Sequence, residues 1–139
     1  MKSTIFTLII AFVIGLFTGC GQDDDPTTQA QTINGTWNLS NVSGGLTGIN
    51  IDYNVGEVSW VFNENTKVLI IENNIESTGP EDIYAGLESG TYDYKIQHED
   101  DHQVLYIDGA ERGILKIEDN ILKIDDGVAV DGFLTEFER

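Results

Sequence analysis

Residues 114–120 read ILKIEDN, and residues 121–127 repeat them almost unchanged as ILKIDDG. Each copy is a short apolar run that ends in acidic residues, with Asn120 or Gly127 where a tight turn favours a positive φ. We interpret the two copies as neighbouring arms of an antiparallel meander. Because the repeat is so short, it predicts local strand pairing and not a repeat architecture.

The same strand and turn pattern continues on both sides of this repeat, and no stretch shows a sustained helical period. It predicts eight strands, at residues 36–40, 58–63, 66–71, 91–96, 103–107, 112–117, 121–125 and 132–138. The unbroken apolar run 68–71 is typical of a strand covered on both faces, and residues 73–87 are expected to form a loop. Eight evenly spaced strands favour a closed barrel, which leaves no exposed edges. The predicted fold is therefore all-β, an eight-stranded antiparallel up-and-down barrel, with a β-sandwich as the alternative.

The chain begins with a basic residue, Lys2, and an apolar run at residues 5–17 that only Thr7 interrupts. A basic start, an apolar run of this length and small residues after it are typical of a secretory signal peptide. The run is shorter than the roughly 17–25 apolar residues of a membrane-spanning helix.

The end of this leader, Phe17-Thr18-Gly19-Cys20, resembles the lipobox of bacterial lipoproteins. The resemblance implies cleavage before Cys20 and attachment of lipid to its thiol, which also accounts for the only cysteine of the chain. The expected organisation is a signal peptide at 1–19, an acidic and polar tether at 20–31 and a folded domain at 32–139. The expected location is the bacterial outer membrane, through a lipid anchor.

Three acidic residues, at positions 23–25, follow the cysteine closely. They resemble a surface-export signal of one group of Gram-negative bacteria, which would place the domain on the outer leaflet. The same residues fit a plain solvated tether, so both interpretations stay open.

The charge of the chain limits the classes of partner that it can bind. Without Lys2, the segment from Cys20 onward has 6 basic and 24 acidic residues, a formal charge of 6 − 24 = −18. Nucleic-acid binding needs clustered Lys and Arg, so we exclude it. Peripheral binding to anionic lipid through surface charge is disfavoured for the same reason.

The segment Gly35-Thr36-Trp37 opens the first expected strand and resembles the G-x-W signature of lipocalins and lipocalin-like domains. The resemblance implies that Trp37 closes one end of the barrel and packs against an arginine at the end of the last strand. Arg139 shares the parity of Phe133 and Phe137, so it can take that place. Gly35, Trp37 and Arg139 are therefore the expected closure residues.

Bulky side chains are expected to fill the barrel interior. They support two interpretations, a packed core or an aromatic cup for one small apolar ligand. The candidate ligand-binding residues are Trp37, Trp60, Phe62, Tyr92, Tyr94, Phe133 and Phe137, and the aliphatic residues expected beside them are Leu39, Val58, Leu115, Ile117, Leu122 and Ile124.

The segment His98-Glu99-Asp100-Asp101-His102 matches the H-E-x-x-H pattern of zinc proteases. That chemistry needs both histidines on one face of a helix, whereas this segment is expected to form a hairpin turn. The sequence therefore predicts no catalytic residue, no metal site and no cofactor. The expected protein is a lipid-anchored envelope lipoprotein that binds a small apolar ligand, or a structural or interaction protein with a filled barrel.

Overall fold

A computed structural model describes residues 31–139 of the chain. The predicted signal peptide at 1–19, the lipidation of Cys20 and the tether up to residue 30 lie outside the described residues. The elements in chain order are β1 (Gly35–Gly44), β2 (Ile49–Asp52), β3 (Val58–Asn63), β4 (Val68–Asn73), α1 (Pro80–Tyr84), β5 (Gly90–Glu99), β6 (His102–Ile107), β7 (Ala110–Glu118), β8 (Ile121–Asp126), the short 3₁₀ turn η1 (Val128–Val130) and β9 (Phe133–Glu138). No helix within this part of the chain has the length and apolar character needed to cross a membrane.

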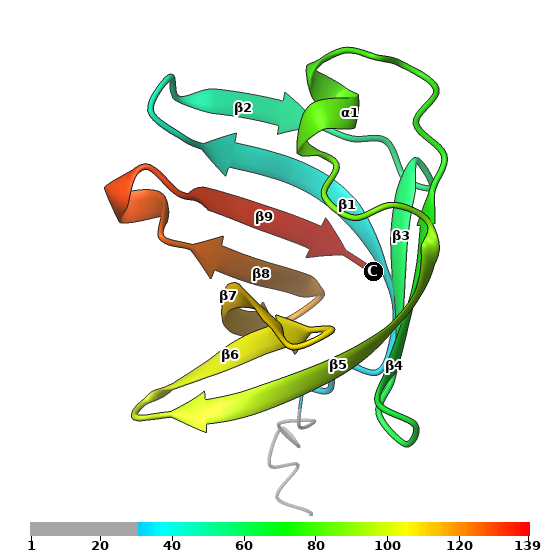
Figure 1. Cartoon of the computed structure of the whole chain (residues 1–139), viewed down its shortest axis with the longest axis vertical. Coiled ribbons are helices and arrows are strands. Elements are labelled where there is room, and N and C mark those ends of the chain that lie inside the picture. The colour runs from blue at the N-terminus through cyan, green and yellow to red at the C-terminus, as the bar shows by residue number, and fades with distance from the viewer. Residues whose placement is uncertain (1–30) are drawn as a thin grey trace, which may run out of the picture.

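Eight of the nine strands form a closed antiparallel barrel (Figure 1). Each of β3 to β8 pairs with the next strand along the chain, and β1 joins β3 on one edge and β9 on the other. The closing pair brings Gly44 opposite Phe133 and Asn38 opposite Glu138. The barrel predicted from the sequence is confirmed, and the alternative, a sandwich, is wrong because all the strands belong to one sheet.

The ninth strand, β2, was not expected from the sequence. It pairs with the same edge of β1 as β3 does, with Asp52 opposite Asn41 and Ser59 opposite Asn38. The two strands therefore run one after the other along β1, and residues 53–57 connect them. Only four residues long, β2 has too few alternating positions to give a clear pattern.

The two ends of the barrel differ. One end, which we call the closed end, holds the start of the described chain, the turns at 64–67, 100–101 and 119–120, and Arg139. Here the Trp37 indole N–H donates to the Ile33 carbonyl at 2.7 Å, and the Arg139 guanidinium donates to the Thr32 carbonyl at 3.1 Å. The other end, which we call the α1 end, holds the connections 45–48, 74–89, 108–109 and 127–132.

The barrel interior is tightly packed along most of its length. The strands bury alternate side chains, as in β1, where Trp37 and Leu39 are fully buried. The core also contains residues that the sequence did not single out as inward candidates, including Ile33, Val42, Leu69, Ile71, Leu105 and Ile107. The expectation that 68–71 is covered on both faces is wrong, because Ile70 is 44% exposed.

Helix α1 lies within the stretch expected to be a loop. Pro80 fits the first turn because it lacks an N–H that would need a partner. The negative charges of Glu81 and Asp82 are stabilised there by the positive end of the helix dipole. Ala85, just after the helix, is buried in the core, and the Tyr53 hydroxyl donates to the Glu81 carbonyl at 3.0 Å. These contacts attach α1 to one end of the barrel (Figure 1).

Candidate functional site

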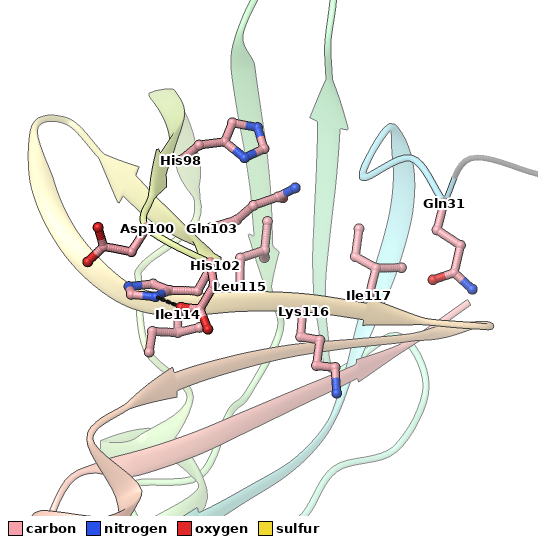
Figure 2. Close-up of a pocket in the computed structure, with 10 residues that line it drawn as sticks. Gln31, His98, Asp100, His102, Gln103, Ile114, Leu115, Lys116 and Ile117 are labelled. Carbon is pink, nitrogen blue, oxygen red and sulfur yellow. Dashed lines mark hydrogen bonds and ion pairs between the residues drawn. The ribbon is translucent and has the colours of Figure 1, made fainter.

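Two hollows of different character lie toward opposite ends of the barrel. The hollow at the closed end has a volume of about 470 Å³ and is lined by the β5–β6 hairpin, part of β7 and Gln31 (Figure 2). One cavity at the α1 end has a volume of about 370 Å³ and lies between α1 and the barrel interior. We call this second hollow the α1 cavity.

The hollow at the closed end contains the H-E-x-x-H segment. The segment is a β-hairpin as predicted, in which His98 pairs with Gln103 and Glu99 pairs with His102. Because paired residues share a face and neighbours along a strand alternate, the two histidines lie on opposite faces of the hairpin. Their imidazole rings point away from each other in Figure 2.

The partners of these residues are ordinary surface contacts. Glu99 accepts a hydrogen bond from the Tyr106 hydroxyl at 3.0 Å, and His102 lies 3.3 Å from the exposed Asp101 carboxylate. Within residues 31–139, no group of three His, Cys, Asp or Glu side chains is arranged to hold a metal ion. The hollow is polar and open, and its geometry offers no helix-based zinc chemistry.

The α1 cavity is built from three parts of the fold. Its floor comes from the inward faces of β1, β3, β8 and β9, and its roof from α1 and the residues that follow it. The remaining wall comes from β7 and the end of β8. The lining residues are Val42, Trp60, Ile124, Phe133 and Thr135 below, Ile83, Tyr84, Ala85, Gly86 and Leu87 above, and Arg112 and Asp126 at the side.

The floor of the cavity is the top of an aromatic cluster that fills the barrel centre. The ring of Trp60 lies 4.7 Å from that of Phe137 and 6.0 Å from that of Phe62, which in turn packs edge-on against Tyr94 at 5.0 Å. Aromatic pairs at these separations stabilise a core beyond their buried area. A ligand could therefore occupy the end of the barrel but not its centre.

The seven aromatic residues named from the sequence separate into two groups. Trp60 and Phe133 line the α1 cavity. Trp37, Phe62, Tyr94 and Phe137 are buried in the packed core, and Tyr92 is half-buried, with its hydroxyl donating to the Glu88 carbonyl at 2.8 Å. None of these five lines the α1 cavity.

The mouth of the cavity has an apolar surround. Tyr84 packs over Phe133 with ring centroids 5.5 Å apart, and Ile83 is 70% exposed although it lines the cavity. Leu46 and Val130, on the other connections of this end, are exposed by 85% and 80%. The α1 end therefore exposes large apolar side chains on three of its connections.

Arg112 reaches the cavity because β7 contains a β-bulge. Leu105 pairs with Gly113 and Tyr106 with Glu111, which leaves Arg112 as an extra residue between two pairs. In a regular strand Arg112 would face outward, as Ile114 does. A bulge changes the direction of a side chain, and here Arg112 lines the cavity wall instead. Gly113 has a φ of 125°, and a Cβ at this position would collide with the backbone of β8.

Two buried hydrogen-bond donors of the lining have no partner within residues 31–139. They are the indole nitrogen of Trp60, whose side chain is buried, and the Nε of Arg112. A buried polar group without a partner costs about 1–3 kcal/mol, so each such group calls for an explanation. The third such group, the Tyr94 hydroxyl, belongs to a side chain that does not line this cavity.

The charges around the cavity do not neutralise Arg112. Asp126 also lines the wall but is exposed, and no carboxylate within the described part of the chain lies within ion-pair distance of Arg112.

Near α1, burial and the carboxylates of Glu81 and Glu57 raise the pKa of Tyr53 to about 12. Tyr53 therefore remains a neutral hydrogen-bond donor to the roof at physiological pH.

Comparison of the chain with protein-family models, with curated proteins and with solved structures finds no match. Membership of the lipoprotein and lipocalin groups therefore remains a prediction from the lipobox and the G-x-W segment.

Sequence reasoning missed Arg112 and the residues of α1. The parity of an uninterrupted strand places Arg112 outside, next to Lys116 and Ile114. One signal was available, because an isolated glycine inside a strand, here Gly113, often marks a bulge. The approach of α1 to the barrel had no comparable signal in the sequence.

Proposed function

We propose that this protein is a lipoprotein of the bacterial outer membrane, anchored through Cys20, whose barrel binds one small apolar ligand in the α1 cavity. The observation that carries the binding proposal is this cavity, roofed by α1 and floored by Trp60 and Phe133. Its volume of about 370 Å³ lies within the range of small-molecule sites, which are concave and largely apolar.

The position of the first described residues supports this proposal. The described chain starts at the closed end, beside Trp37 and Arg139, whereas the α1 cavity lies at the other end. A tether that joins Cys20 to residue 31 would hold the closed end and leave the cavity mouth free to exchange ligand.

The experiment is native mass spectrometry of the protein extracted from its own membrane. The expected result is a mature chain that begins at acylated Cys20 and carries a small molecule that dissociates on activation. A mature N-terminus other than acylated Cys20 would disprove the anchor. A chain without ligand in every preparation would count against the binding proposal.

A second candidate function follows from the packed barrel centre. Because Phe62, Tyr94 and Phe137 fill the interior, the barrel could also act as a rigid scaffold whose outer surface contacts another envelope component. The exposed Leu46, Ile83 and Val130 favour a contact at the α1 end. Cross-linking in intact cells from position 46 separates the two functions, since only the scaffold function requires a protein partner there.

A further inference from the structure

The α1 cavity combines an apolar floor with two lining residues whose buried hydrogen-bond donors have no partner within residues 31–139. Trp60 is only 6% exposed, so its indole N–H cannot be satisfied by bulk water. Arg112 carries a permanent charge and a buried Nε with no partner within residues 31–139. Both side chains line the same cavity.

We infer that the α1 cavity binds a small carboxylate with an apolar body, whose carboxylate oxygens accept hydrogen bonds from Arg112 and Trp60. This inference rests on the proposed binding function and specifies the ligand class. A guanidinium presents a planar fork of donors that matches a carboxylate, and hydrogen bonds between charged groups are about twice as strong as neutral ones. The apolar body would lie against Phe133 and Ile124.

The β-bulge supports this assignment because it brings Arg112 into the cavity wall at a structural cost. A regular β7 would leave Arg112 on the solvated outer face, like Lys116. The bulge requires Gly113, at a φ of 125°, and interrupts the pairing with β6. Bulges that redirect a side chain occur frequently beside binding sites.

The negative charge of the chain from Cys20 onward disfavours the approach of anions in general. With a formal charge of −18 from Cys20 onward, derived from 6 basic and 24 acidic residues, long-range steering repels a small hydrophilic anion. Binding of a carboxylate therefore depends on the local guanidinium and on burial of an apolar body. This combination predicts selectivity for amphipathic acids over acetate or phosphate.

The test uses the full mature chain in nanodiscs, with radiolabelled octanoate as the probe and methyl octanoate as a competitor. Nanodiscs with a Thr135→Phe variant, whose cavity is filled by the new side chain, correct for partition of the probes into lipid. We expect octanoate to bind about tenfold more tightly than its methyl ester, since one charged hydrogen bond contributes roughly that factor.

Two variants test the assigned groups, and a third serves as their control. Arg112→Gln should abolish the preference for the acid, and Trp60→Phe, which keeps the ring but removes the N–H, should weaken octanoate binding severalfold. The control Lys95→Gln removes one exposed charge of β5 outside the cavity and should leave the preference unchanged. Circular dichroism of each variant reports whether the barrel is intact.

The outcomes distinguish the inference from the function on which it rests. Equal binding of acid and ester in the wild type and in Arg112→Gln would overturn the carboxylate assignment and leave the binding function standing. Absence of saturable binding of either probe above the Thr135→Phe background would overturn both.

Discussion

The guanidinium carbon of Arg139 lies 4.3 Å from the centroid of the Trp37 ring. The contact joins the end of β9 to the first strand, and hydrogen bonds to the carbonyls of Thr32 and Ile33 fix the two side chains. A cation over an indole face contributes about 0.5–2 kcal/mol. The segment before β1 is thereby attached to the closed end of the barrel.

Replacing Arg139 with methionine should reduce stability by about 1–3 kcal/mol, because it removes the cation–π contact and the hydrogen bond to Thr32. Urea unfolding followed by tryptophan fluorescence measures the change. Arg139→Lys keeps a cation but loses the planar stacking, so its stability should lie between those of the wild type and Arg139→Met. An Arg139→Met midpoint equal to that of the wild type would show that the contact does not stabilise the barrel.

Gly113→Ala should destabilise the protein by roughly 1–3 kcal/mol, since the new Cβ would meet the Asp125 carbonyl at a strained φ. The matched control is Gly35→Ala, since Gly35 has a similar φ of 112° but no atom within 4 Å of the new Cβ. Thermal unfolding of both variants measures the difference. Equal losses would mean that φ alone, and not the close approach of β8, requires Gly113.

Thr135→Phe should fill the α1 cavity and prevent ligand binding while the barrel remains folded. Thr135 faces inward between Val42 and Ile124, and all three line the cavity. Thr91→Phe, on the exposed face of β5, adds the same ring outside and should leave binding unchanged. Native mass spectrometry counts the bound ligand. Retention of ligand by Thr135→Phe would place the binding site elsewhere.

Stability should fall as the pH rises from 10 toward about 12, because the pKa of Tyr53 is about 12 when folded and near 10.0 when unfolded. In that range the unfolded chain loses a proton that the folded chain retains, so unfolding becomes more favourable. Burial also raises the pKa of Tyr94, which acts in the same direction.

The variant Tyr53→Phe tests this assignment. It should cost about 1 kcal/mol at neutral pH, through loss of the hydrogen bond to the Glu81 carbonyl. The same variant should show a shallower alkaline decline than the wild type in urea unfolding at a series of pH values. An unchanged decline would assign the titration to other tyrosines.

Cys20→Ser should move the protein from the membrane to a soluble fraction or leave its precursor uncleaved, because lipid attachment requires the thiol. Detergent phase partition and mass spectrometry of the N-terminus measure the change. Ser77→Ala, at an exposed position of the 74–89 connection, controls for effects on expression. Membrane retention of a cleaved Cys20→Ser chain would contradict a lipid anchor at this residue.

The hairpin pattern was readable from the sequence because it depends on neighbours along the chain. Alternation of apolar residues and turn residues between them predicted eight strands of the barrel, including the repeat at 114–127. The hairpin at His98–His102 was predicted on the same basis. The bulge at Arg112, strand β2 and helix α1 were not predicted. Strand β2 is too short to show a clear alternation, and the bulge depends on the register between β6 and β7.

The sequence by itself therefore determined the all-β class and the order of the strands, since side-chain alternation and turn residues act locally. Only the tertiary structure decided where the interior is packed and where it is hollow. Trp60 and Phe62 share a parity in β3, yet only Trp60 lines the α1 cavity, because α1 covers that end and leaves space above it. Arg112 enters the wall for a related reason. Its direction is set by the register between β6 and β7, which is a property of two strands and not of one.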